Sequence, residues 1–238
     1  MSSEKPLEGR LLVVTGASRG LGRALALAAA GAGARLVLIA RTVGGLEEVD
    51  DEARKLGAEP ATLVPQDLLE VEALDRLGAV LYQRHGQLDG LILAHGMMGH
   101  LSPVGHIVPK VWEESLAVNA TASYRLLRSL LPLLQQGEAP RVLAITDEAG
   151  RNKAYWAAYD ASKRALEALI ISLVGETQET KLKINLAAPP PMATRLRGVA
   201  FPGENQATLA QPEQIAPLLL PALYPEENRH GAILRPAL

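Results

Sequence analysis

Tyr159 and Lys163 lie four residues apart in a segment, 154–174, whose composition predicts a helix. Side chains at this spacing share one face of a helix and can contact each other. A nearby ammonium group stabilises a phenolate and lowers the pKa of a Tyr from its ordinary value of about 10. The pair therefore predicts a general acid and base that exchanges a proton near neutral pH, although the same spacing also suits a Tyr packed on a Lys stem.

A glycine-rich turn is the second candidate site. Gly16, Gly20 and Gly22 follow the apolar run 11–14 and precede the Ala- and Leu-rich segment 23–32. A turn of this kind between a strand and a helix lets backbone N–H groups approach a pyrophosphate, and the start of the helix adds positive potential. The sequence therefore predicts a nucleotide site here. The phosphate-loop pattern G-x-x-x-x-G-K-[ST] is absent, which argues against a nucleoside-triphosphate hydrolase.

Apolar runs of strand length alternate along the chain with longer amphipathic segments. Runs that are apolar on both faces and separated by helices predict an α/β fold, with a parallel sheet covered on both sides. The predicted strands are 11–15, 35–40, 61–65, 88–94, 141–146, 183–187 and 232–234, and the predicted helices begin near residues 21, 45, 71, 109, 154 and 212. The segment 189–211 is rich in Pro, Gly and polar residues, and we expect a long loop on the substrate side.

The composition argues against several classes of protein. The chain has 238 residues, of which 48% are hydrophobic, enough to bury a sizeable core. A formal net charge of −2 without a basic stripe argues against a nucleic-acid partner. The absence of cysteine excludes disulfides and thiol catalysis and fits a cytoplasmic protein. The apolar stretch 24–40 is interrupted by Arg35 and rich in Gly and Ala, so we expect no membrane span.

The glycine turn and the Tyr-x-x-x-Lys pair, in this order on a seven-strand pattern, resemble the short-chain dehydrogenase/reductase family over essentially the whole chain. The resemblance implies one Rossmann domain spanning residues 1–238, a doubly wound parallel sheet of about seven strands with helices on both faces. It also implies hydride transfer to or from a nicotinamide cofactor, served by Tyr159 and Lys163. By the same resemblance, Asp67 contacts the adenine, the main chain of Asn119 helps to hold a water-bearing proton relay, and Thr194 bonds the nicotinamide carboxamide.

The choice of cofactor follows from charge. Arg41 stands at the end of the second predicted strand, where a carboxylate would accept a hydrogen bond from the 2′-hydroxyl of NAD, and Ala40 and Thr42 beside it carry no charge. Arg19 adds a second guanidinium, so we expect NADP(H) to be preferred over NAD(H). The predicted cofactor contacts are Gly16, Ser18, Arg19, Gly20, Leu21, Gly22, Arg41, Asp67, Leu68, Ala94, His95, Gly96, Tyr159, Lys163, Pro189, Met192 and Thr194.

Two stretches depart from the family pattern. The fourth strand ends in Leu93-Ala94-His95-Gly96 where the family has Asn-Asn-Ala-Gly, so His95 stands in the place of a small residue. It could stack near the adenosine ribose or fill a gap. With His100 and His106 it could suggest a metal site, but nothing else supports one and we predict none. Pro189-Pro190 replaces the usual Pro-Gly after the sixth strand, which removes a backbone donor.

The departure with the greatest chemical consequence follows the fifth strand. The family places there a Ser that donates a hydrogen bond to the substrate carbonyl, three residues before a Gly and thirteen before the Tyr. The count from Gly150 gives Asp147, whereas the count from Tyr159 gives Thr146. We favour Thr146, whose hydroxyl can donate. An ionised Asp147 is acceptor-only, and it could instead accept from an alcohol, pair with Lys163 or raise the pKa of Tyr159.

These patterns predict an NADP(H)-dependent oxidoreductase that interconverts a small-molecule carbonyl and an alcohol, with Tyr159, Lys163, Asn119 and either Thr146 or Asp147 at the catalytic centre. The altered positions leave an alternative, a cofactor-binding protein with little or no turnover, such as a redox sensor or a partner subunit. The helical segments 112–134 and 155–174 are apolar on more than one face, which predicts a homodimer or homotetramer. The apolar side chains of 192–201 suggest a hydrophobic substrate.

Overall fold

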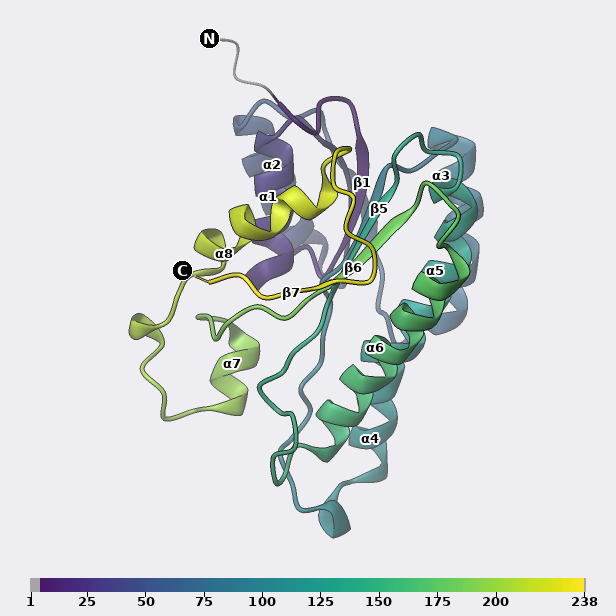
Figure 1. Ribbon diagram of the computed structural model, residues 1–238. Helices are drawn as coiled ribbons and strands as arrows, with labels where there is room; N and C mark the ends of the chain where they lie inside the picture. Colours follow the sequence, from purple (N-terminus) through teal and green to yellow (C-terminus); the bar gives the residue numbers. More distant parts are fainter. Residues whose placement is uncertain (1–4, 238) are drawn as a thin grey trace.

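The computed structural model describes residues 5–237 and contains one seven-stranded parallel sheet (Figure 1). The strand order is β3-β2-β1-β4-β5-β6-β7. The strands are β1 (Leu11–Thr15), β2 (Arg35–Ala40), β3 (Thr62–Pro65), β4 (Gly90–Leu93), β5 (Arg141–Ile145), β6 (Lys183–Ala187) and β7 (Ile233–Leu234). This confirms the predicted doubly wound Rossmann fold. The order reverses between β1 and β4, and the carboxyl ends of these two strands form the switch point at which such folds bind ligands.

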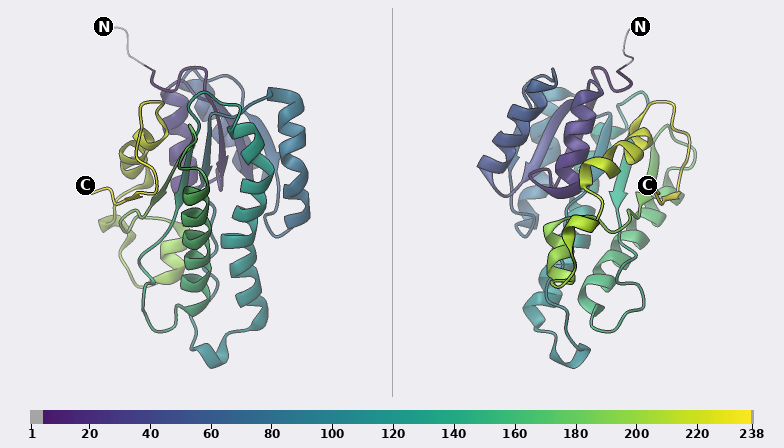
Figure 2. Two further views of the ribbon diagram at one scale, coloured as in Figure 1. Left: turned by 45° about the vertical axis from the view of Figure 1, so that its right-hand side comes forward. Right: turned by 90° about the vertical axis from the view of Figure 1, so that its left-hand side faces the viewer.

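Helices cover both faces of the sheet (Figures 1 and 2). One face carries α1 (Gly20–Gly31), α2 (Val43–Lys55) and α8 (Pro212–Leu219), and the other carries α3 (Val71–His85), α4 (Pro109–Leu116), α5 (Ala122–Leu134) and α6 (Ala157–Glu176). The predicted loop 189–211 is only partly irregular, because it contains α7 (Arg195–Ala200) and a short 3-10 turn at Gln206–Thr208. The predicted helix starts agree with the structure to within three residues.

The core is aliphatic and lies in two layers. All five residues of β1 are buried, and successive side chains of a strand point to opposite faces of a sheet. Leu12 and Val14 accordingly pack with the helices of the α1 face, whereas Leu11 and Val13 pack with α3 and α5. The continuous apolar strands of the sequence therefore belong to a sheet that is buried on both sides.

A π-helical turn, Ala117–Thr121, joins α4 to α5 without a break in the helical backbone. Such turns hold one residue more than an α-helical turn and widen the helix locally. This turn buries Asn119 completely. Neither the hydrophobic pattern nor the composition of the segment distinguishes it from ordinary α-helix, so the sequence predicted one helix there.

Within residues 5–237, the structure has no helix that is both long enough and apolar enough to cross a membrane. A cytoplasmic location stays a prediction.

Candidate active site

A cavity of about 1440 Å³ lies at the carboxyl edge of the sheet. The loops that follow β1, β4, β5 and β6 line it, together with α7 and the segment after β7. Every predicted site residue except Asn119 contributes to its wall. The volume exceeds the roughly 300–1,000 Å³ of a typical small-ligand pocket, so it can hold a dinucleotide and a second molecule together.

The glycine turn shapes one end of the cavity. Gly16 has a φ of +65°, and a Cβ there would lie 2.9 Å from the Cα of His95. A Cβ on Gly22 would collide with the carbonyl group of Gly16, so the turn closes only with glycine at these positions. Arg19 provides the N-cap of α1 with an extended backbone and no side-chain hydrogen bond to the helix. The first N–H groups of α1 therefore stay available to an anion.

Three arginines surround this end of the cavity. Arg19, Arg41 and Arg195 all line the wall, and none of them forms an ion pair within residues 5–237. Burial is the largest cause that lowers the pKa of Arg19, and the charges of Arg195 and Arg41 lower it further. Arg195 was not predicted from the sequence. A glycine cradle beside three uncompensated guanidinium groups fits the phosphates of a dinucleotide.

Tyr159 and Lys163 lie on one face of α6, as predicted, and both are buried. The Tyr159 hydroxyl donates to Asp147 Oδ2 at 2.8 Å, and the Lys163 ammonium donates to the carbonyl of Ile145 at 3.1 Å. The expected lowering of the Tyr159 pKa is wrong for this structure. Burial raises it well above its usual value, and the charge of Asp147 raises it further. Burial also lowers the pKa of Lys163 to about 8.

The structure separates the two candidates that the sequence left open. The Thr146 hydroxyl donates to Glu167 Oε1 at 2.6 Å and is fully engaged there, whereas Asp147 lies beside the Tyr159 hydroxyl. The other oxygen of Asp147 accepts the N–H of Ala149 at 2.7 Å. The count from Gly150 thus gives the residue that contacts Tyr159, and the assignment of the catalytic role to Thr146 or to Asp147 stays a prediction. The counts from Gly150 and from Tyr159 give different residues, so they cannot both hold.

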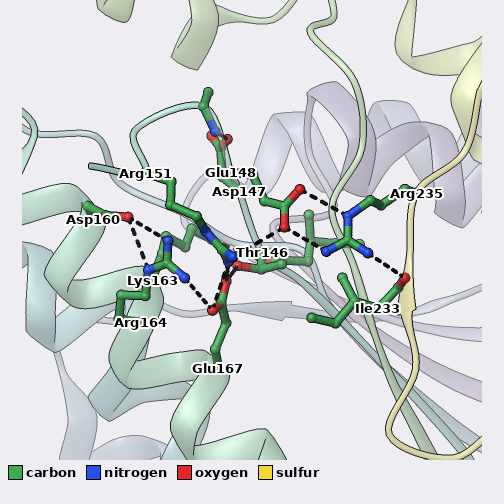
Figure 3. A network of polar contacts seen from close by, with 12 residues as sticks. Thr146, Asp147, Glu148, Arg151, Asp160, Lys163, Arg164, Glu167, Ile233 and Arg235 are labelled. Atoms are coloured by element: carbon green, nitrogen blue, oxygen red, sulfur yellow. Dashed lines mark hydrogen bonds and ion pairs between the residues drawn. The ribbon is translucent and has the colours of Figure 1, made fainter. Parts of the chain in front are cut away.

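The carboxylate of Glu167 holds the Thr146 hydroxyl by a hydrogen bond (Figure 3). The Glu167 residue is only 8% exposed, and its carboxylate accepts from Thr146 as well as from Arg151 and Arg164, the latter two at 3.0 Å. A buried carboxylate needs such donors. Sequence reasoning missed Glu167, although its position four residues after Lys163 places it on the same face of α6.

Asn119 is buried behind the cavity wall. Its side chain accepts from the Met97 N–H and donates to the Met97 carbonyl and to Ser162, each at 2.8 Å. A Cβ on Gly96 would lie 3.5 Å from the Lys163 ammonium and 3.7 Å from Asn119 Oδ1. Asn119 thus links the π-helical turn to the segment after β4 and to α6, close to Lys163.

His95 fills a gap between β1 and α5. Its Nδ1 lies 2.7 Å from the Thr15 hydroxyl and its Nε2 lies 3.1 Å from the Ser123 hydroxyl. Burial lowers the pKa of His95 to about 3, so the imidazole is neutral. We expected the ring either to stack near the adenosine ribose or to fill a gap, and its contacts with Thr15 and Ser123 are those of a gap-filling side chain. Within the described residues, no group of three His, Cys, Asp or Glu side chains is arranged to hold a metal ion.

The remaining predicted contacts take local structural roles while lining the cavity. Asp67 lies three residues before Glu70, the N-cap of α3, and accepts from the Leu69 N–H at 3.0 Å, so it stabilises the turn that precedes the helix. Thr194 caps α7 by accepting the N–H of Arg197 at 3.2 Å. Met192 is buried and pairs with Ala210 in an isolated bridge that closes the segment 189–211.

A model of the short chain dehydrogenase family matches residues 10–205. The chain belongs to the short-chain dehydrogenase family. It is 34% identical to the uncharacterised oxidoreductase YciK of Escherichia coli over 218 residues, which cover 90% of this chain and 86% of that protein. The family resemblance inferred from the two motifs is thereby confirmed, and the protein is an oxidoreductase of this family.

Solved structures show the same fold. A protein from Pseudomonas syringae described as a short-chain dehydrogenase superposes with a TM-score of 0.94 at 32% identity, covering 99% of this chain and 97% of that one. A short-chain dehydrogenase from E. coli CFT073, solved as a complex with NADPH, superposes with a TM-score of 0.92 at 30% identity, covering 98% of each chain. These relatives do not favour the non-catalytic alternative.

Proposed function

We propose that this protein is a single-domain, NADP(H)-dependent oxidoreductase that interconverts a carbonyl and an alcohol. The observation that carries the proposal is the placement of Tyr159 and Lys163 in the same cavity as the glycine turn. This arrangement brings a proton-exchanging group and a phosphate cradle to one edge of the sheet. NADPH, when bound, supplies the hydride that reduces the substrate carbon.

Other residues of the chain bind the cofactor and handle the proton. The glycine turn and the start of α1 hold the pyrophosphate. Lys163 donates to Ile145 and keeps further N–H donors for the hydroxyl groups of the cofactor ribose. Tyr159 carries the proton that a newly formed alkoxide would need. Asp147 accepts the hydrogen bond of that hydroxyl and raises the pKa of Tyr159, so loss of the Tyr159 proton is costly beside it.

Arg19, Arg41 and Arg195 support the choice of NADP(H). They form a cationic group without acidic partners among residues 5–237, and a 2′-phosphate is the group that distinguishes NADP from NAD. The solved relative in complex with NADPH adds support. We further propose that α7 and its flanking loops form the substrate side, because Leu196, Val199 and Phe201 line the cavity there.

Arg41→Ala is expected to weaken the binding of NADPH by about 10- to 100-fold and to leave the binding of NADH unchanged, because only NADPH offers a phosphate to the guanidinium. Fluorescence titration of both cofactors measures this difference. Arg54→Ala is the matched control, since Arg54 lies on α2 outside the cavity with its side chain 56% exposed. Equal affinities of the wild type for NADPH and NADH would overturn the proposed cofactor preference.

We also propose a homo-oligomer built on α4 and α6. The exposed apolar side chains Val104, Val108 and Trp112 lie beside a shallow groove that Ala157 and Ala161 of α6 complete. Light scattering at micromolar concentration should give at least a dimer. Trp112→Glu is expected to shift the mass toward the monomer. Val80→Glu should not, because Val80 is an exposed side chain of α3, away from the groove. A monomeric wild type would contradict the proposal.

A further inference from the structure

The reactive end of the cavity presents a carboxylate where a neutral hydroxyl donor would assist a carbonyl. Asp147 lines the cavity, and its Oδ2 contacts the Tyr159 hydroxyl. The hydroxyl of Thr146, the neighbouring residue, is engaged with buried Glu167. Among residues 5–237, no basic side chain forms an ion pair with Asp147. The nearby Lys163 directs its ammonium to the Ile145 carbonyl.

This arrangement is poorly matched to a neutral carbonyl. A carbonyl oxygen gains negative charge when a hydride adds to its carbon, and an ionised carboxylate beside it is acceptor-only and repels that charge. The catalytic gain comes from groups that stabilise the charge which develops during the reaction. The charge of Asp147, which lies beside the Tyr159 hydroxyl, has the wrong sign for a developing oxyanion, and the Lys163 ammonium near it is directed to the Ile145 carbonyl.

A protonated imine has the opposite requirements. Its nitrogen carries a positive charge and an N–H donor, both of which suit an acceptor-only carboxylate. We propose that the cavity binds a protonated imine through Asp147 and reduces it to the amine, an inference that rests on the proposed transfer of hydride from NADPH. The hydride adds to the imine carbon, the C=N π pair moves to nitrogen, and the iminium becomes a neutral amine while NADPH becomes NADP⁺.

Tyr159 fits this reaction because no proton has to leave it. The iminium already carries its proton, so Tyr159 stays protonated and its hydroxyl orients Asp147. Burial and Asp147 both hold the pKa of Tyr159 well above its usual value, which suits a permanent donor better than an acid. Around this point the wall contains the apolar side chains of Met98, Ala149, Leu196 and Phe201, with the cations of Lys153 and Arg197 stacked on the Phe201 ring. The substrate class is therefore an imine with a hydrophobic substituent.

Binding tests the inference without turnover. The protein, with and without saturating NADPH, is titrated by calorimetry with 2-phenylpyrrolidine, a protonated amine, and with 2-phenyltetrahydrofuran, its neutral counterpart of similar shape. We expect the wild type to prefer the ammonium and Asp147→Asn to weaken its binding by about 10- to 100-fold, with the ether unaffected. Asp160→Asn is the control, because Asp160 pairs with Arg164 on the same helix and does not line the cavity.

Turnover gives a second measurement on substrates with one carbon skeleton. NADPH oxidation is followed with 2-phenyl-1-pyrroline and with the ketone butyrophenone, and we expect the wild type to reduce the imine in preference to the ketone. Asp147→Ser, which the loop accommodates as a smaller side chain, should reverse the preference. An ammonium affinity that Asp147→Asn leaves unchanged, or reduction of the ketone in preference to the imine, overturns the inference. Failure to bind NADPH overturns the proposed function. In that case the calorimetric titration without cofactor still tests whether Asp147 binds the ammonium group.

Discussion

Asp147→Ser is expected to raise the rate of ketone reduction by about 10²–10³-fold, the usual effect of one well-placed donor on turnover. Two changes act in the same direction. A serine hydroxyl can donate to the carbonyl oxygen, and removal of the carboxylate eliminates one of the causes that raise the pKa of Tyr159. Tyr159 then becomes a stronger acid for the alkoxide. Initial rates of NADPH oxidation with butyrophenone, at saturating cofactor, measure the effect.

Tyr159→Phe in the Asp147→Ser background is the control for this gain. It removes the proton donor while keeping the ring, so the gained ketone reduction should fall by about 10²–10⁴-fold. Binding of NADPH, followed by fluorescence, should be retained in both variants because neither alters the glycine turn. A double variant as active as Asp147→Ser would show that Tyr159 does not supply the proton, and an Asp147→Ser variant as slow as the wild type would refute the role assigned to Asp147.

The sequence could not decide between Thr146 and Asp147 because the decisive contact is distant along the chain. Both residues stand next to each other after β5, and each matched one of the two counts. The hydrogen bond that Thr146 donates to Glu167 joins residues 21 positions apart in the sequence, and it depends on how α6 packs against β5. Composition and spacing carry no information about that packing, whereas the glycine turn after β1 is a local feature and was predicted correctly.

Gly78→Ala is expected to lower the free energy of unfolding by about 3 kcal/mol. Gly78 lies on α3 where it crosses α5, and its N–H donates to the Ser129 hydroxyl at 2.8 Å. A Cβ at this position would collide with the main-chain carbonyl of Ser129, and backbone atoms cannot move aside as a flexible side chain can. Thermal unfolding should show a fall in Tm of about 6–12 °C for a chain of this size.

Gly175→Ala is the matched control. Gly175 lies in the last turn of α6, is exposed, and would place its Cβ in open space. Alanine has the higher helix propensity, so this change should raise the stability by up to about 1 kcal/mol. If the two variants unfolded at the same temperature, the close approach of α3 to α5 would not be the source of the predicted loss.

The fold was predicted more completely than the site because it rests on repeated signals. Seven apolar runs, each separated by a helix-length segment, leave few alternatives to a covered parallel sheet. The site depends on single residues whose environments come from several elements. His95 illustrates the limit: its place after β4 was clear, but its partners Thr15 and Ser123 come from β1 and α5.

The π-helical turn at Ala117–Thr121 imposes a length constraint on the helix that contains it. Each residue of a helix advances the chain by about 100° around the axis. The wider π-helical turn absorbs the rotation of its extra residue locally, so deleting one residue from it would restore regular α-helix and leave α5 in its present orientation. Asn119 would lose its alignment with Met97, whereas Ser129 would still face Gly78. A one-residue gap here should therefore disturb the catalytic centre while it spares the packing of α3 on α5.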